Sequence, residues 1–224
     1  MAISKILRQF RNSSVVQKLY IWYLHLFGRN HYNVKRSNRF ICNGAILKHC
    51  EINILGRNNI VEIEGGRLTK CTFSIFGNNC KIKIGTKNTL NCIQFWIEDN
   101  NSEICIGHHN TFTGKLQLAV IEGTKIMIGD NNLFSSEINI VTGDSHSILD
   151  LDGHRINPSK DIRIGNHNWI GNKVTIAKGV TILDDTIVGR HSLVLKPCDK
   201  CSVAIAGVPA KVVKEGINWD IDRV

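Results

Sequence analysis

Two histidines and three carboxylates lie close together in residues 143–160, a stretch that reads GDSHSILDLDGHRINPSK. Histidine is suited to general-base chemistry because its pKa lies near neutrality. His146 and His154 are both candidates for such a base, with an ordinary surface histidine as the alternative. A nearby carboxylate can orient the ring of His146 by accepting from its second nitrogen, as can a backbone carbonyl. The carboxylates are those of Asp144, Asp150 and Asp152.

Positive charge outweighs negative charge in this sequence. The whole chain carries a formal net charge of +9, from 28 Lys and Arg against 19 acids. This excess favours an anionic partner, whether a phosphorylated cofactor, nucleic acid, an acidic polymer or a membrane surface. We find no recognised nucleic-acid-binding motif and expect no nucleic acid.

The chain of 224 residues is long enough for one substantial domain. We interpret its eight cysteines as free thiols. Six of them stand in or beside strand-like stretches, where a thiol behaves as a small hydrophobe. Cys198 and Cys201 have C-x-x-C spacing, but no second pair accompanies them, so we expect no metal. We therefore predict a cytoplasmic protein. We find no secretory signal, and the apolar run at 19–27 is too short to span a membrane.

From Ile164 the sequence divides into consecutive blocks of six: IGNHNW, IGNKVT, IAKGVT, ILDDTI, VGRHSL and VLKPCD. Each block begins with an aliphatic residue, and its fifth residue is mostly small or β-branched. This period is typical of a triangular solenoid, in which each block forms one short strand and its first residue points into a narrow core. The aromatic content of 7% agrees with a core that has little room for rings. Trp169 occupies a sixth position, from which its indole should point outward.

Looser copies of the repeat precede these blocks. Gly85, Gly107 and Gly129 each close a strand-like segment and recur at 22-residue intervals. Alternating isoleucines within each segment place one face inward. We interpret 56–65 as the first ordered coil. The sequence thus predicts an all-β domain over 41–207, a left-handed parallel β-helix solenoid.

Three regions depart from the repeat. The period breaks once, at 143–160, and an excursion from a rigid solenoid is a usual position for function. Residues 1–40 carry apolar residues at helical spacing among lysines and arginines. We interpret them as an amphipathic helix that caps the first coil, with a peripheral contact to a membrane or an acidic polymer as the alternative. Residues 208–224 form a C-terminal tail.

Two blocks resemble the hexapeptide-repeat acyltransferases, within them the galactoside, xenobiotic and polysaccharide O-acetyltransferases. WIGNKVTIAKGVTI (169–182) is similar to the family pattern W-I-G-x-x-[VA]-x-I-x-x-G-V-x-I, and SLVLKPCDKCSVAIAGVPAKVVK (192–214) is similar to its C-terminal pattern. The D-S-H at 144–146 also matches. The chain departs from the family at 207–210, which read Gly-Val-Pro-Ala, and at 197–199, where Pro-Cys-Asp reshapes the last turn.

The resemblance implies an enzyme that moves an acetyl group from acetyl-CoA to a sugar hydroxyl, in a bacterial surface polysaccharide or its precursor. It implies a homotrimer with sites between subunits. It also places Lys196, Lys211 and Lys214 at the phosphates of coenzyme A, which point cations suit, although a solvated surface charge explains any one of them nearly as well. His146 is then the general base with Asp144 beside it, and Trp169 lines the slot for the acceptor and the thioester. Backbone N–H groups along Gly171 and Ala177 become candidate partners for the thioester oxygen and the pantetheine amides.

Three other functions stay open. An N-acetyltransferase that acts on an amino-sugar nucleotide would use the same fold. A non-catalytic β-helix scaffold would explain the repeats, but not the loop histidine, Trp169 and the terminal lysines together. A β-helix carbonic anhydrase would need three histidines that converge on one metal. His108, His109 and His167 lack the acidic and glutamine partners that we expect at such a site.

Overall fold

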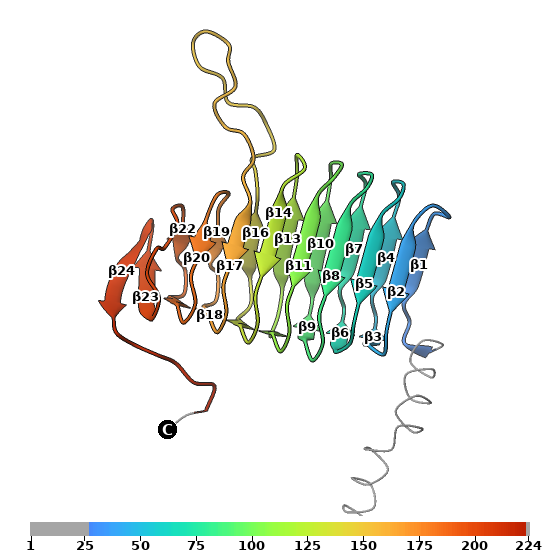
Figure 1. The fold of residues 1–224 in the computed structure, drawn as a ribbon, viewed down its shortest axis with the longest axis horizontal. Helices are drawn as coiled ribbons and strands as arrows, with labels where there is room; N and C mark the ends of the chain where they lie inside the picture. The colour runs from blue at the N-terminus through green and yellow to red at the C-terminus, as the bar shows by residue number, and fades with distance from the viewer. Residues whose placement is uncertain (1–26, 223–224) are drawn as a thin grey trace, which may run out of the picture.

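The computed structural model describes residues 27–222, which wind into a left-handed parallel β-helix (Figure 1). Short strands from successive coils stack into three sheets, which form the sides of a prism. We call them sheet A, sheet B and sheet C, in the order in which the chain visits them. The predicted fold class is confirmed for the described residues. The predicted N-terminal helix falls largely in residues 1–26, outside them.

Sheets A and B consist of parallel strands only. Sheet A contains β1 (His31–Val34), β4 (Glu51–Ile54), β7 (Thr72–Ile75), β10 (Ile93–Ile97), β13 (Leu116–Val120), β16 (Ile138–Val141), β19 (Thr175–Ile176) and β22 (Leu193–Val194). Sheet B contains β2 (Arg39–Cys42), β5 (Ile60–Ile63), β8 (Lys81–Ile84), β11 (Glu103–Ile106), β14 (Lys125–Ile128), β17 (Ile162–Ile164) and β20 (Thr181–Ile182).

Sheet C ends in an antiparallel pair of strands. It contains β3 (Ile46–Lys48), β6 (Arg67–Thr69), β9 (Thr89–Asn91), β12 (Thr111–Phe112), β15 (Leu133–Phe134), β18 (Trp169–Ile170), β21 (Ile187–Val188), β23 (Val203–Gly207) and β24 (Ala210–Glu215). Strand β24 turns back on β23 and forms the edge of the sheet. Within residues 27–222 no helix is long and apolar enough to cross a lipid bilayer.

The aliphatic first residues of the six-residue blocks form the core that the repeat predicts. Each is at most 3% exposed: Ile164, Ile170, Ile176, Ile182, Val188 and Val194. Rings fill the middle coils, where Phe73 stacks on Phe95 and Phe112 on Phe134, each pair with centroids 4.4 Å apart. The core therefore does hold aromatic rings, contrary to our expectation. In-register parallel strands bring identical rings face to face, so that they need little width.

A column of buried asparagines marks the corner between sheets B and C. The Oδ1 of Asn110 accepts from the backbone N–H of Asn132 at 2.9 Å, and Asn132 does the same for Asn168 at 2.8 Å. These bonds satisfy backbone groups that the coils bury, and they fix the register of the stack. At the same corner a Cβ on Gly107 would lie 2.8 Å from the carbonyl oxygen of Gly129. This close approach explains the recurring glycines.

The solenoid begins earlier than its sequence pattern indicates. Strands β1, β2 and β3 already form a coil, so the expectation that 56–65 is the first coil is wrong. This coil escaped notice because β1, HYNV, is mostly exposed and lacks the apolar alternation of later strands. The predicted domain limit at residue 41 falls inside β2, and the predicted tail at 208–224 contains β24.

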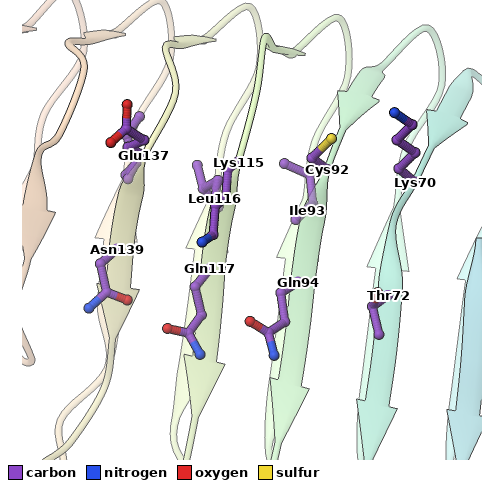
Figure 2. A pocket seen from close by; sticks show the side chains of 11 residues that line it. Lys70, Thr72, Cys92, Ile93, Gln94, Lys115, Leu116, Gln117, Glu137 and Asn139 are labelled. Carbon is purple, nitrogen blue, oxygen red and sulfur yellow. The ribbon is translucent and has the colours of Figure 1, made fainter.

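The outer face of sheet A carries a row of uncharged polar side chains (Figure 2). Thr72, Gln94, Gln117 and Asn139 occupy the same register position on four neighbouring strands, from β7 to β16. A groove of about 480 Å³ lies over this row.

Candidate functional site

The excursion 143–160 leaves the solenoid between β16 and β17, at the corner between sheets A and B, and projects away from the prism (Figure 1). His146 lies exposed near the base of this loop. Its ring makes no hydrogen bond within the described part of the chain, so both nitrogens are available to a ligand. The structure thus places the predicted base on the part of the chain that departs from the repeat.

Asn157 holds the base of the loop together. Its Nδ2 donates to the backbone oxygen of His146 at 2.9 Å and to Asp144 at 2.7 Å. Its Oδ1 accepts from the backbone N–H of Ile148 at 2.7 Å and from Arg155 Nε at 3.2 Å. Asn157 is only 7% exposed. This buried amide therefore fixes the backbone on which His146 stands.

Asp144 faces a lysine of the solenoid and not the ring of His146. Lys178 Nζ donates to Asp144 Oδ2 at 2.6 Å and to the backbone oxygen of Asn157 at 2.9 Å. The hydrogen bond from Lys178, followed by that from Asn157, lowers the pKa of Asp144 below its ordinary value. Asp144 thus stays ionised and anchors the loop to the coil that contains Lys178.

A second ion pair anchors the other side of the loop. Arg155 Nη1 donates to Glu122 Oε1 at 2.6 Å, and the backbone N–H of Ser159 donates to Glu122 Oε2 at 3.1 Å. The hydrogen bond from Arg155, with a further one from Ser159, lowers the pKa of Glu122 to about 2. Both ion pairs join the loop to the rigid solenoid, and sequence reasoning identified neither Glu122 nor Lys178.

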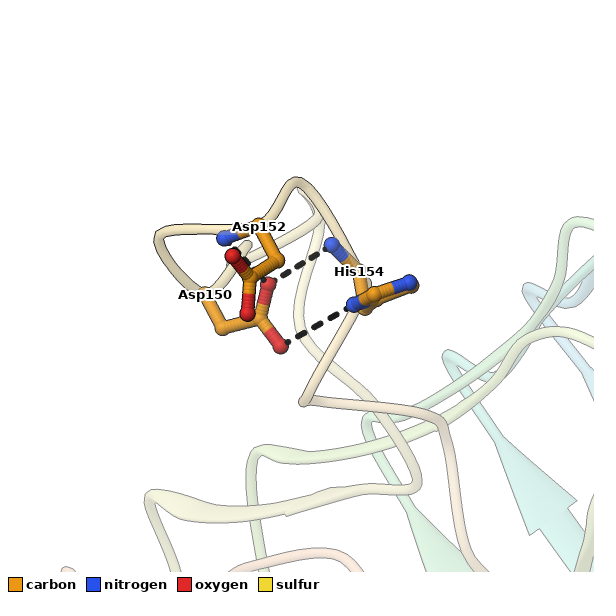
Figure 3. A group of neighbouring side chains, drawn as sticks. All are labelled: Asp150, Asp152 and His154. Atoms are coloured by element: carbon orange, nitrogen blue, oxygen red, sulfur yellow. Dashed lines mark hydrogen bonds and ion pairs between the residues drawn. The ribbon is translucent and has the colours of Figure 1, made fainter.

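The tip of the loop is closed by Asp150 (Figure 3). Its Oδ1 accepts from the backbone N–H groups of Asp152 at 3.0 Å and His154 at 2.8 Å, and its Oδ2 lies 3.4 Å from His154 Nδ1. The three side chains offer ligand atoms within 4.8 Å of one another, but all are exposed and their contacts close a turn. Within the described residues Asp150 thus contacts His154 and not His146.

Trp169 stands on β18 in sheet C, and its ring points outward with 41% of its surface exposed. A largely apolar groove of about 430 Å³ runs beside it, lined in part by Gly171 and Arg190. The N–H of Gly171 donates to the carbonyl of Val188, and the N–H of Ala177 donates to the carbonyl of Val194 in the next coil. Both predicted backbone donors are therefore already used within the solenoid.

A second tryptophan covers this surface, and sequence reasoning missed it. The Trp219 ring stacks on His167 with centroids 4.6 Å apart, and its Nε1–H donates to the backbone oxygen of His167 at 2.8 Å. The centroids of the Trp219 and Trp169 rings lie 6.1 Å apart. Asp185 Oδ1 lies 2.7 Å from His167 Nδ1 on the other side. The segment after β24 thus returns to sheet C and packs beside Trp169.

The three C-terminal lysines divide between two places. Lys196 follows β22 in sheet A, whereas Lys211 and Lys214 lie on β24, the edge strand of sheet C. All three are exposed, and none forms an ion pair within residues 27–222.

The histidines considered for a metal site are used in the coil corners. His108 Nδ1 accepts from the backbone N–H of Thr86 at 3.0 Å, and His167 contacts Asp185 and Trp219. Within the described residues these rings form no cluster of ligand atoms with His109.

A single chain does not bring His146 and Trp169 together. The loop leaves the corner between sheets A and B, whereas Trp169 points outward from sheet C. In a three-sided prism sheet C lies opposite that corner, and Figure 1 shows the loop and β18 on opposite sides of the solenoid.

The residues with the clearest six-residue period match a known family model. Its description is bacterial transferase hexapeptide (six repeats), and it matches residues 161–196. Polysialic acid O-acetyltransferase of Neisseria meningitidis is 38% identical over 77 residues, which cover 34% of this chain and 36% of that protein. Galactoside O-acetyltransferase of Escherichia coli K12 is 46% identical over 54 residues, covering 24% of this chain and 26% of that protein. The chain thus matches about a third or less of each of these relatives.

Solved structures extend the likeness along most of the solenoid. The polysialic acid O-acetyltransferase OatWY superposes with a TM-score of 0.76 at 29% identity, covering 88% of this chain and 90% of that one. The polySia-specific acetyltransferase NeuO superposes with a TM-score of 0.73 at 25% identity, covering 86% and 88%. The likeness therefore reaches far beyond residues 161–196.

Proposed function

We propose that this chain is a hexapeptide-repeat acyltransferase, and that it is an O-acetyltransferase that moves an acetyl group from acetyl-CoA to a sugar hydroxyl of a polysaccharide. One observation carries this proposal: the likeness to a polysialic acid O-acetyltransferase over 88% of the chain. The basic net charge of +9 agrees with an acidic acceptor and a phosphorylated co-substrate. We place the enzyme in the cytoplasm, where acetyl-CoA is made and its cysteines stay reduced.

In this proposal His146 acts as the general base. One ring nitrogen accepts the proton of the sugar hydroxyl while the hydroxyl oxygen attacks the thioester carbonyl. The tetrahedral intermediate then expels coenzyme A as the thiolate. The proton on His146 passes to the leaving sulfur. Asn157 holds the backbone of His146, and Lys178 holds Asp144, so the loop is fixed before substrate binds. A base that is already positioned avoids an entropic cost in the transition state.

The groove beside Trp169 is our candidate for the pantetheine arm. Its lining is mostly apolar and comes from β18, β21 and the residues that follow them, and β23 separates β21 from the edge strand β24. We assign Lys211 and Lys214, which lie on β24, to the phosphates of coenzyme A. Lys196 of the neighbouring subunit is our candidate for a third contact to the same coenzyme A. Since the N–H groups of Gly171 and Ala177 are occupied, donors to the thioester oxygen come from side chains or from the neighbouring subunit.

The separation of His146 from Trp169 supports a homotrimer with its sites between subunits. A loop that projects from one corner can reach sheet C of the next copy around a threefold axis, which closes a ring of three equal interfaces. Each site then takes its base from one subunit and its thioester slot from the next.

The experiment is a thiol-release assay with acetyl-CoA and a panel of acceptors: polysialic acid, neutral galactosides, free serine, a simple amine and chloramphenicol. We expect release of coenzyme A that depends on a saccharide, with an added acetyl ester found by mass spectrometry of the product. Preference for the amine, serine or chloramphenicol over every saccharide would overturn the proposal, as would thiol release that no acceptor accelerates.

A further inference from the structure

The polar row on sheet A runs along the solenoid axis at a constant step. Gln94 pairs in register with Thr72 on one side and Gln117 on the other, and Gln117 pairs with Asn139. Neighbouring strands lie about 4.8 Å apart. Each step of the row, from one strand to the next, is therefore roughly as long as one pyranose unit. In Figure 2 these four side chains project from the same face of the sheet.

The amides of this row are free, in contrast to the asparagine column at the corner. Within residues 27–222 the side chains of Gln94 and Gln117 make no hydrogen bond, whereas Asn139 Oδ1 is buried and does not face a ligand. Asn110 and Asn132, by comparison, bond from coil to coil. Amides that served only to stack coils would be bonded in the same way. The row on sheet A therefore offers donors and acceptors to a ligand.

Two lysines border this row and give it a charge preference. Lys70 and Lys115 line the same groove of about 480 Å³. Both are exposed, and neither forms an ion pair within the described residues. Glu137 also lines the groove, but its charge is paired, because its Oε2 lies 3.7 Å from Lys173 Nζ. Free amides beside free cations suit a molecule that carries many hydroxyls together with anionic groups.

The groove continues to the base of the loop that carries His146. A second groove, of about 590 Å³, shares Gln117 and Asn139 with the first and reaches Asp144 and Ser145. Trp96 also lines it and offers an aromatic face beside the amides. Four acids line this second groove. Glu122 pairs with Arg155 and Asp144 with Lys178. Glu98 and Asp99 accept hydrogen bonds from Trp96 Nε1 and from the backbone N–H of Glu122, but within the described residues neither forms an ion pair.

We propose that this row, the sheet A track, binds an anionic polysaccharide lengthwise, so that successive sugar units lie on successive coils and one unit reaches His146. The amides of Gln94 and Gln117 bond to sugar hydroxyls, and Lys70 and Lys115 pair with the anionic groups. This inference rests on the proposed function and deepens it: the acceptor is a polymer already assembled, and units beyond the reacting one contribute to its binding.

The test compares two double variants with a charge-matched control in the full-length protein. The variants are Gln94→Ala with Gln117→Ala, and Lys70→Ala with Lys115→Ala. The control is Lys81→Ala with Lys83→Ala, which removes two lysines from β8 on sheet B. Affinity electrophoresis measures binding of polysialic acid, hyaluronan and polygalacturonate, with dextran as the neutral polymer. Thiol release measures transfer to polymer, transfer to a saturating disaccharide, and hydrolysis of acetyl-CoA alone.

We expect both variants to bind at least one acidic polymer about tenfold or more weakly than wild type, as the loss of several polar contacts implies. The control should bind normally, and all proteins should hydrolyse acetyl-CoA and use the disaccharide alike. Unchanged polymer binding in both variants would overturn the track but leave the proposed function standing. Wild-type protein that binds none of the acidic polymers would overturn it too, whereas absence of transfer to every saccharide would overturn the proposed function itself.

A third variant covers the case in which the alanine proteins fail to fold. Gln94→Glu with Gln117→Glu keeps the side-chain size and should repel an anionic polymer. Light scattering accompanies each variant. A changed mass of the assembly would mean that this face joins copies of the chain, and the track would be rejected.

Discussion

His146 and Trp169 lie on opposite sides of the same prism. The loop that carries His146 leaves the corner between sheets A and B, and Trp169 points outward from sheet C. Because short in-register strands make the solenoid rigid, no small movement within one chain brings these two residues together. An acetyl transfer that needs both must be built from two copies of the chain.

Replacement of His146 tests the base directly. We expect His146→Ala to lower kcat by ~10²–10⁴, the range for loss of a positioned base, while acetyl-CoA binding measured by calorimetry stays near wild type. The control is His154→Ala, because His154 is in the same loop but contacts Asp150 at the tip. A His146→Ala enzyme with a near-normal rate would remove this residue from the mechanism.

Asn157 should behave as a positioning residue. Asn157→Ala removes the bonds that fix the backbone of His146, and displacement of a base by about 1 Å can cost up to ~10² in rate. We expect kcat to fall with little change in the KM for acetyl-CoA, and hydrogen exchange of residues 143–160 to accelerate. Asn166→Ala, which removes corner bonds to Asp184, should leave kcat unchanged. Equal losses in both variants would indicate general destabilisation instead.

The ion pair between Glu122 and Arg155 predicts how the loop responds to acid. The pKa of Glu122 is about 2 instead of 4.5. A carboxyl with a lowered folded pKa stabilises the structure above its ordinary pKa, and this contribution is lost as pH falls through the folded value. The loop anchor should therefore persist below pH 4.5 and be released only near pH 2.

Exchange of the Ser159 amide, which donates to Glu122, reports this release. After correction for intrinsic exchange, the protection of the Ser159 amide should stay high in wild type from pH 4.5 down to near pH 2. It should be low at every pH in Glu122→Gln. Loss of wild-type protection already at pH 4.5 would contradict the assigned pair.

The three C-terminal lysines should act through charge on coenzyme A. Replacement of Lys196, Lys211 and Lys214 by Ala should raise the KM for acetyl-CoA, and the wild-type affinity should weaken with salt. If these lysines hold the 3′-phosphate, the triple variant loses the preference for acetyl-CoA over its dephospho form. A preference that survives would place the phosphate elsewhere, for example at Arg190 in the groove beside Trp169.

The sequence predicted the solenoid well where its period is strict. From Ile164 onward, first residues every six positions are buried, as expected from blocks of constant length. The earlier coils have corners of variable length, so the period fades, and the exposed β1 gave no apolar signal. The loop and His146 stood out because they interrupt a regular pattern.

The partners of the site residues were not visible in the sequence. Asp144 looked like a partner of His146 because the two are neighbours along the chain, yet Lys178 holds it across 34 positions. Trp219 contacts His167 across 52 positions, and no periodicity connects them. Such contacts depend on where coils end and how a tail returns, which local patterns do not encode.

Mixing two inactive variants tests most directly whether each site is built from His146 of one subunit and Trp169 of the next. His146→Ala and Trp169→Ala should each be nearly inactive alone. In equal mixture after dissociation and reassembly, a site is intact when the loop comes from the Trp169→Ala chain and sheet C from the His146→Ala chain. For a ring of identical interfaces this holds at about one quarter of the sites. We predict recovery of about a quarter of wild-type activity, whereas mixed assemblies that native mass spectrometry verifies and that stay inactive would contradict the account.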